Sequence, residues 1–244
     1  VSGGRILETG KELWKKYQAV ETINGKGKLF MPGLIDSHMH TGQQLLKGLV
    51  LDAKPIIWTR IMLPFESTLT PDKMRLCAQA AALEMIKCGT AGFIDAGSYH
   101  METAASVYME DAARVYAESG LRGALSYSTM DEEGLPESIA MDAEEALKRT
   151  DSLYDRFHGK GNLKVYYSLR ALNSCSSRLV ELEAMRARER GTMLQAHMNE
   201  YMGEINGIVD REGMRPYEYL EKMHVLGSNF LGAHSLILSE QEKS

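Results

Sequence analysis

Two histidines separated by one residue give the sequence its first candidate site. His38 and His40 follow Pro32-Gly33 and the short apolar pair Leu34-Ile35. Alternate side chains of an extended strand share a face, so the two imidazoles would point the same way at the end of a strand. Two imidazoles on one face supply half of a tetrahedral metal site. The alternative is chance, because H-x-H also occurs in loops and on strand surfaces.

A third histidine and a carboxylate come later in the chain. The stretch Leu194-Gln195-Ala196-His197-Met198-Asn199-Glu200 runs through the end of a predicted strand. A divalent metal needs several convergent imidazoles, and hydrolysis needs a carboxyl group that can carry protons. Alone, this H-x-x-E pattern could be a surface pair. Its position at a strand's C-terminal end, after H-x-H, favours the metal site, and His234 ends a further predicted strand.

In this order, the motifs resemble those of the amidohydrolase superfamily, most closely its branch of cytosine/guanine deaminases and adenosine-type and triazine aminohydrolases. The resemblance rests on P-G-[apolar]-[apolar]-[DN]-x-H-x-H, on H-x-x-E and on Ala233-His234, and it covers nearly the whole chain. It implies an α/β fold, a (β/α)8 TIM-type barrel with a small N-terminal β-sandwich. The three motifs would end strands one, five and six of the barrel.

The resemblance also implies a role for each motif residue. His38, His40 and His197 would bind one divalent metal ion, with Zn²⁺ expected and Fe²⁺ the alternative. Such a metal lowers the pKa of water toward about 7. Glu200 and His234 would be catalytic: Glu200 would protonate a ring nitrogen of the substrate, and His234 would flank the reacting water.

The expected number of metal ions follows from a missing lysine. Relatives with two metals bridge them through a carbamylated lysine at the end of strand four. That strand ends here in Tyr167-Ser168-Leu169-Arg170, and Lys164 lies at its start, so one metal is expected. The family's last ligand, an aspartate after strand eight, would fall beyond Ser244. We therefore expect a barrel truncated before strands seven and eight.

Three further residues are predicted to bind substrate. Gln43 follows the H-x-H motif, and Arg170 stands four residues before Ser174-Cys175-Ser176, as in guanine deaminases. Both side chains can donate hydrogen bonds to the edge of a purine. Adenosine-type relatives carry G-P-H-S where this chain has Leu169-Arg170-Ala171-Leu172, whereas Glu66 matches both groups. The ordinary alternatives are a solvated loop residue for Gln43 and a rim salt bridge for Arg170.

These residues together predict a metal-dependent aminohydrolase that removes an exocyclic amino group from a purine-like or related nitrogen heterocycle. A guanine-type substrate is favoured. The alternatives are an adenosine/S-adenosylhomocysteine-type deaminase and a triazine chlorohydrolase. A rival of another class is a non-catalytic barrel scaffold, which would have no need of the motif histidines and glutamate together.

Alternating strands and helices would position these motifs. Apolar runs predict strands over 29–36, 91–96, 122–128, 163–169, 193–198 and 230–234. Helical spacing and end signals predict helices from Pro71 to about 88 and over 102–119, 136–158, 177–190 and 215–224. Such alternation predicts a parallel sheet. Residues 1–30 are predicted to be part of the β-sandwich and 31–244 the barrel.

Composition limits the class of protein and its partners. The chain has 244 residues, 44% hydrophobic and 25% charged, with a net charge of -5, which is typical of a globular protein and argues against nucleic acid or an anionic membrane as partner. No apolar run or signal peptide points to a membrane. Cys77, Cys88 and Cys175 lack disulfide-like spacing and predict reduced thiols in a cytoplasmic protein. The expected partner is a small heterocyclic substrate, and a homo-oligomer is left open.

Overall fold

The computed structural model describes residues 1–51, 58–97, 108–131 and 141–243 and divides the chain into two compact units, Val1–Pro32 and Gly33–Ser244. The first unit holds a short 3-10 turn, Leu13–Lys15, and a single antiparallel bridge between Ser2 and Arg5. No strand forms within residues 1–32, all of which are described, so the predicted β-sandwich remains a prediction.

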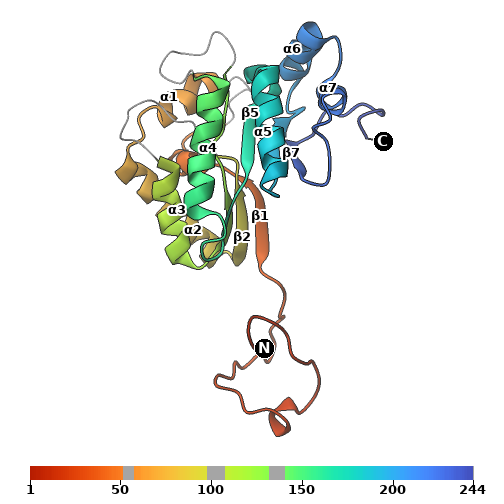
Figure 1. Cartoon of the computed structure of the whole chain (residues 1–244). Coiled ribbons are helices and arrows are strands. Elements are labelled where there is room, and N and C mark those ends of the chain that lie inside the picture. The colour runs from red at the N-terminus through yellow and green to blue at the C-terminus, as the bar shows by residue number, and fades with distance from the viewer. Residues whose placement is uncertain (52–57, 98–107, 132–140, 244) are drawn as a thin grey trace. The chain divides into compact units, whose positions relative to one another are not determined.

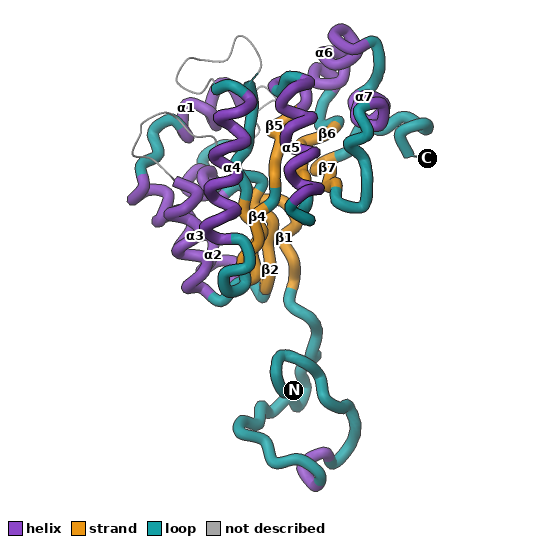
Figure 2. The backbone as a smooth tube through the Cα atoms, in the orientation of Figure 1, coloured by secondary structure: helices purple, strands orange, loops and turns teal. Residues whose placement is uncertain are grey.

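The strands of the second unit are all parallel in their pairing. They are β1 Leu34–Met39, β2 Thr90–Asp95, β3 Arg122–Leu125, β4 Leu163–Val165, β5 Tyr167–Ala171, β6 Leu194–Met198 and β7 Phe230–His234. One sheet has the order β1-β2-β3-β4 and the other β5-β6-β7 (Figure 2). Backbone hydrogen bonds from Thr129 N to Ser168 O (2.9 Å) and from Arg170 N to Thr129 O (2.8 Å) join the segment after β3 to β5.

Helices alternate with these strands along the chain. They are α1 Leu63–Glu66, α2 Pro71–Lys87, α3 Tyr108–Ser119, α4 Ala143–Phe157, α5 Ser177–Glu189, α6 Met202–Glu212 and α7 Pro216–Lys222. The segment before α1 contains the 3-10 stretch Thr41–Leu46 and a π-helical turn, Trp58–Met62. In Figure 1, α2, α3, α4 and α5 stand side by side over one face of the strands. No helix in the described part of the chain is both long and apolar enough to cross a membrane.

The predicted α/β alternation with parallel strands is confirmed. β7 has the predicted bounds, and α2 begins at the predicted Pro71. Thr70 caps α2 by accepting a hydrogen bond from Lys73 N at 3.3 Å. The predicted apolar stripe of α2 is buried in the core: Met74, Ala78, Ala81 and Met85. Helical spacing was sufficient here because the stripe has a sheet to pack against.

Five of the six predicted strands differ in their bounds from the observed ones, by one to three residues in β2, β3 and β6 and more widely in the other two. The first strand begins at Leu34, not at residue 29, since pairing with β2 starts where Leu34 N donates to Gly89 O at 2.9 Å. Pro32 lacks the amide hydrogen that an earlier ladder bond would need. The predicted strand 163–169 is interrupted at Tyr166, between β4 and β5. The later start of β1 places His38 within the strand and His40 just after it.

Among the helices, α4 starts later than predicted, and one observed helix was missed. Helix α4 begins at Ala143, because Asp142 caps it by accepting a hydrogen bond from Glu145 N at 2.7 Å; residues 136–140 of the predicted helix lie outside the described residues. Helix α6 was not predicted. It contains Gly203 and Gly207, which weaken helical propensity, but Ile205 and Ile208 are buried and stabilise it through packing.

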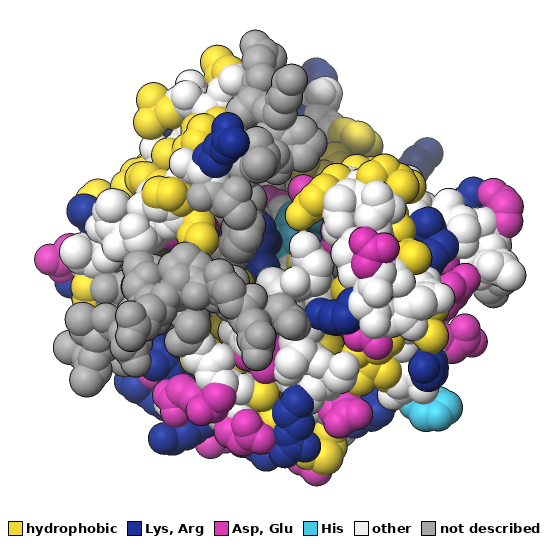
Figure 3. Space-filling model, turned by 90° about the horizontal axis from the view of Figure 1, so that it is seen from above, with side chains coloured by type: hydrophobic (Ala, Val, Ile, Leu, Met, Phe, Trp, Pro, Cys, Tyr) yellow, Lys and Arg dark blue, Asp and Glu magenta, His cyan; other side chains and the backbone are white. Residues whose placement is uncertain are grey.

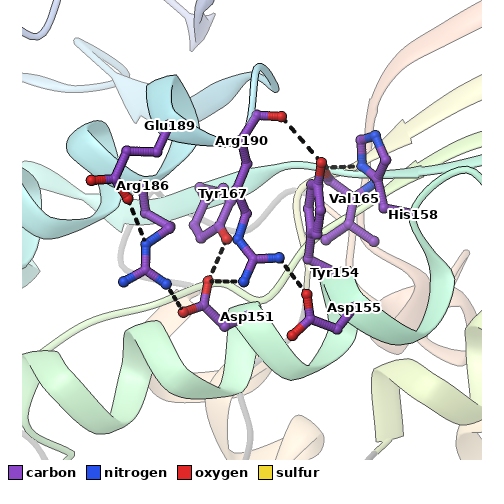
Figure 4. Close-up of polar contacts among 9 residues, drawn as sticks. All are labelled: Asp151, Tyr154, Asp155, His158, Val165, Tyr167, Arg186, Glu189 and Arg190. Carbon is purple, nitrogen blue, oxygen red and sulfur yellow. Dashed lines mark hydrogen bonds and ion pairs between the residues drawn. The ribbon is translucent and has the colours of Figure 1, made fainter.

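A polar network ties α4, α5 and β5 together on the outer side of the strands (Figure 4). Asp151 of α4 accepts a hydrogen bond from the Tyr167 hydroxyl of β5 at 2.5 Å and pairs with Arg186 of α5. Arg190 reaches both Asp151 at 3.4 Å and Asp155. Neighbouring Glu183 is fully buried, and this burial, with the charge of Asp151 as a second cause, raises its pKa well above the usual range.

The pKa of Glu183 predicts a pH dependence of stability. The folded protein binds this proton more tightly than the unfolded chain, so the stabilising contribution is full below about pH 4.3 and declines as pH rises toward the folded pKa. We expect Glu183→Gln to gain stability relative to wild type from pH 5 to pH 8, by up to about 1.4 kcal/mol for each pH unit. Denaturant unfolding at several pH values measures this.

The matched control is Glu181→Gln, an exposed carboxylate on the same helix, which should show a flat difference from wild type. A Glu183→Gln difference that does not change with pH would contradict the prediction.

Candidate metal centre

Four histidines from distant parts of the sequence converge at the C-terminal ends of β1, β6 and β7. The ring centroid of His38 lies 5.1 Å from that of His40 and 4.9 Å from those of His197 and His234. The rings of His40 and His197 are stacked, with centroids 5.1 Å apart. Their Nε2 atoms lie 3.1 Å apart, close to the spacing of about 3.3 Å expected for two imidazoles on one tetrahedral zinc.

The ring of His40 is oriented by the end of β2. Its Nδ1 atom lies 2.7 Å from Gly97 O, so Nδ1 carries the hydrogen and Nε2 is left as an electron-pair donor. Gly97 N donates in turn to Asp95 Oδ1 at 2.9 Å. The Asp95 carboxylate also accepts the hydroxyl of Thr41, which follows His40 directly. A buried carboxylate thus fixes both sides of His40.

Three of the imidazoles form a set that fits a metal ion. His38, His197 and His234 each offer one ligand atom within 4.8 Å of the other two. The Nδ1 atom of His38 is buried and has no hydrogen-bond partner among the described residues, so it is an electron-pair donor available to a ligand. An all-imidazole set suits zinc or iron better than calcium or magnesium. His234 therefore belongs to the same three-histidine set as His38 and His197. His40 is not in this set, but its Nε2 atom lies next to that of His197.

The protonation of these rings favours metal binding. Burial is the main cause that lowers the pKa of His38 to about 4 and that of His40 to about 3, and it lowers the pKa of His197 well below the usual value. The positive charge of Arg170 acts in the same direction on all three. Neutral imidazoles are the form that binds metal.

Arg170 lies among the histidines and not merely at the rim. Its Nη1 atom is 2.7 Å from His197 Nε2 and 3.3 Å from His197 Nδ1. The side chain is half-buried. A permanent cation at this position can interact with a carbonyl or an anionic group of a bound molecule.

Glu200 follows the turn after β6 and lies beside His234. The distance from Glu200 Oε2 to His234 Nε2 is 3.8 Å, and both side chains are partly open to solvent. Figure 3 looks onto this end of the molecule and shows histidine side chains in a hollow, with basic side chains nearby. A small molecule entering the hollow would meet the carboxylate and the imidazoles together.

Gln43, three residues after His40, is joined to Glu66, which lies 23 positions further along the chain. Gln43 Nε2 donates to Glu66 Oε1 at 2.6 Å, and Glu66 is buried with 3% of its surface exposed. Gln43 is therefore not a freely solvated loop residue. The predicted roles of these two residues in substrate binding remain predictions, as do the metal and catalytic roles.

Sequence reasoning missed the residues that support the centre. Asp95 and Gly97 hold His40, and Glu204 bonds to the backbone that carries Glu200. An acidic residue at the end of a predicted strand was the available signal for Asp95. The partners themselves could not be read from the sequence, since 57 positions separate His40 from Gly97.

Comparison with known proteins identifies the family. The amidohydrolase family model matches residues 29–244, so the chain belongs to this family and the resemblance is confirmed. It is 31% identical over 245 residues to 5'-deoxyadenosine deaminase of Methanobrevibacter smithii, covering 99% of this chain and 53% of that protein. It is also 31% identical to 5-methylthioadenosine/S-adenosylhomocysteine deaminase of Thermococcus onnurineus, in an alignment that covers 99% of this chain and 54% of that protein. The chain spans about half the length of the curated relatives it matches.

Solved structures share the fold. Guanine deaminase from C. acetobutylicum, with guanine bound in its active site, superposes with a TM-score of 0.79 at 21% identity. Atrazine chlorohydrolase from Arthrobacter aurescens TC1, complexed with zinc, gives a TM-score of 0.79 at 20% identity. Each alignment covers 86% of this chain and 50% of the other.

The support given to His40 by Gly97 can be tested directly. A Cβ atom at Gly97 would lie 2.5 Å from Ser126 O and 2.7 Å from Ser128 N, and its φ is +82°. Gly97→Ala should therefore shift the carbonyl that orients His40. We expect zinc affinity to fall by about ten- to a hundredfold, the usual effect of losing a partner of a metal ligand. Titration with zinc against a competing chelator measures this.

Gly120→Ala is the control, because Gly120 has φ +80° but no atom within 4 Å of the added Cβ. It carries the same backbone strain without the clash. Equal zinc affinity in the two variants would contradict the proposed orienting role of Gly97.

Proposed function

We propose that this amidohydrolase is a metal-dependent deaminase of adenosine-type compounds. The observation that carries the proposal is the convergence of His38, His40, His197 and His234 beside the Glu200 carboxylate. The substrate class is supported by the relatives, named as deaminases of 5'-deoxyadenosine and of 5-methylthioadenosine/S-adenosylhomocysteine. The guanine-type preference predicted from Gln43 and Arg170 has weaker support, from a structural neighbour at 21% identity.

In the proposed reaction, water replaces the exocyclic amino group of the purine. A C–O bond forms at the carbon that bears the nitrogen, the C–N bond breaks, and ammonia leaves. Of the two protons of the water, one leaves on the ammonia and the other remains on the ring nitrogen of the oxo-purine product. Zinc bound by the histidines would supply Lewis acidity, which lowers the pKa of water from 15.7 to about 7. Proton transfer and the orientation of the water are assigned to the protein's own side chains.

Glu200 is the proposed proton carrier. Its carboxylate lies 3.8 Å from His234 Nε2, and the side chain is partly open to solvent, so it has room to approach a ring nitrogen. Protonation of that nitrogen makes the adjacent carbon more electrophilic. The carboxylate can then take a second proton from the water and deliver it to the amino group, which leaves as ammonia. General acid–base assistance of this kind is typically worth about 10² to 10⁴ in rate.

His234 is proposed to orient the attacking water. It comes from a different strand than Glu200, and its imidazole faces His38 and His197 as well as the carboxylate. A neutral ring at this position can accept a proton from water and pass it toward Glu200.

The remaining predicted residues belong to the substrate side of the proposed site. The buried Glu66 carboxylate, held by Gln43, is an acceptor suited to hydroxyl or amino groups, and Arg170 is a donor suited to oxygen atoms. We further propose that residues 31–244 form part of a (β/α)8 barrel, truncated before strands seven and eight, and that this part binds one zinc ion. The chloride-displacing reaction of the triazine branch would use the same parts and is an outcome to be tested.

Release of ammonia from a panel of purines tests the proposal. The purified protein with zinc should deaminate adenosine-type compounds faster than guanine or a chlorotriazine. No bound transition metal, none taken up and no ammonia from any substrate would favour the non-catalytic scaffold instead.

Glu200→Gln separates proton transfer from metal binding. Glutamine has nearly the same shape but cannot carry the proton, so we expect the zinc content to stay at the wild-type level while kcat falls by about 10² to 10⁴. Zinc and ammonia release are measured in the same preparation. Loss of zinc together with activity would show instead that Glu200 is a ligand or a structural support.

Arg170→Met tests how the site selects among purines. Its guanidinium, next to His197, can donate to a ring carbonyl, and a lost hydrogen bond from a charged donor weakens binding by roughly ten- to a hundredfold. We expect KM for an oxo-purine, or its inhibition constant if it is not converted, to rise by this factor. The effect on an adenosine-type compound should be smaller.

Arg178→Met is the control, since Arg178 is an exposed arginine of α5 paired with Glu144. Equal losses for both purines in Arg170→Met, together with a lower melting temperature, would assign Arg170 a structural role.

A further inference from the structure

The turn between β6 and α6 has to set the direction of the Glu200 side chain. Asn199 adopts a left-handed conformation there, with φ +48°, and reverses the chain just after the strand that carries His197. The Glu200 side chain has 42% of its surface exposed. Packing therefore restrains this side chain little, and its position depends on the backbone from which it projects.

A second glutamate, four residues further on, binds both amides of this turn. Glu204 Oε1 accepts a hydrogen bond from Asn199 N at 3.1 Å, and Glu204 Oε2 accepts one from Glu200 N at 2.9 Å. Only 1% of the surface of Glu204 is exposed. Each carboxylate oxygen thus holds one of two consecutive amides.

Other contacts fix the opposite side of the same turn. Asn199 O accepts a hydrogen bond from Ile237 N at 3.2 Å. The side chain of Asn199 donates to Ile237 O at 3.2 Å and to Glu242 Oε1 at 3.1 Å. Glu242 is itself fully buried and paired with Arg215 at 2.8 Å. The turn is therefore clamped between the segment after β7 and the Glu204 carboxylate.

We infer that Glu204 is a positioning residue, which holds the backbone at Asn199 and Glu200 so that the Glu200 carboxyl faces His234 and the substrate. This inference rests on the proposed deaminase function. Glu204 acts through Glu200 and is not expected to touch the reacting atoms.

The chemistry of the contact explains why a carboxylate is placed there. Two backbone amides need two acceptors, and a carboxylate offers an acceptor on each oxygen. Glutamine would keep one acceptor, its side-chain carbonyl oxygen. Its NH2 group would face the other backbone amide, so that two donors would meet without an acceptor. Burial raises the pKa of Glu204 to about 7, and the two amide hydrogen bonds oppose that rise.

A graded pair of variants tests the inference in the purified zinc-loaded protein. Glu204→Gln keeps one of two acceptors, and Glu204→Met fills similar space with none. We expect kcat to fall by about tenfold in Glu204→Gln and by up to about 10² in Glu204→Met. Only part of the general acid–base assistance, typically worth about 10² to 10⁴, is lost when its carboxyl is misplaced. KM and zinc content should stay within about twofold of wild type.

Amide hydrogen exchange provides a measurement that does not need activity. The exchange rates of Asn199 N and Glu200 N should rise in the same order, Glu204→Met more than Glu204→Gln. Asp210→Asn, an exposed acid-to-amide change on the same helix, is the control and should alter neither kcat nor these rates.

Two results would overturn the inference. One is a loss of kcat no larger than the loss of zinc or of folded protein, which would reduce Glu204 to a structural residue. The other is unchanged exchange at both amides, which would show that the hydrogen bonds from Asn199 N and Glu200 N to Glu204 do not hold this turn. A wild-type protein that releases no ammonia from any purine would refute the proposed function, and the exchange rates would then decide separately whether Glu204 holds the turn.

Discussion

The parallel pairing of the strands is the constraint on which the rest of the structure depends. Because every strand pair in the described sheets is parallel, the carboxyl ends of β1 and β2 lie at one edge of their sheet, and those of β6 and β7 lie at one edge of theirs. The histidine rings show that these two edges meet. His40 of the H-x-H motif and His197 are 157 positions apart in the sequence, yet their rings are in contact. No local interaction could bring them together, so the site exists only once the sheets have formed.

Polar contacts inside the strands connect the two sheets beneath the histidines. Gln195 of β6 donates to Asp95 O of β2 at 3.1 Å and to the Ser126 hydroxyl at 2.8 Å. Ser126 donates to the same Asp95 carbonyl at 2.7 Å. These groups are buried, and a buried donor without a partner would be destabilising by about 1 to 3 kcal/mol. The network therefore fixes β6, which carries His197, relative to the end of β2, where Asp95 and Gly97 hold His40.

The histidines of the site come from strand ends, whereas several other candidate residues come from turns and connecting segments. The histidines project from strand ends, which the sheet holds in place. Glu200 projects from a turn, and Gln43 and Glu66 come from the segment between β1 and α2. Turns and long connections vary more than strands, so different substrates can be served around one metal centre. In agreement with this separation, the relatives by sequence are named as deaminases of 5'-deoxyadenosine and of 5-methylthioadenosine/S-adenosylhomocysteine, whereas the solved structures that share the fold are a guanine deaminase and an atrazine chlorohydrolase.

The sequence by itself determined the alternation of strands and helices, the family and the order of its motifs. Short-range patterns carry that information: apolar runs, the cap at Thr70 and the spacing of the histidines. Only the tertiary structure decided that Gly97 orients His40, that Arg170 lies against His197 and that Glu204 binds the amides of the Glu200 turn. It also decided that α6 forms despite two glycines, since packing of Ile205 and Ile208 outweighs helical propensity. These contacts depend on which distant backbone atoms the parallel sheets bring together, and no local spacing encodes that.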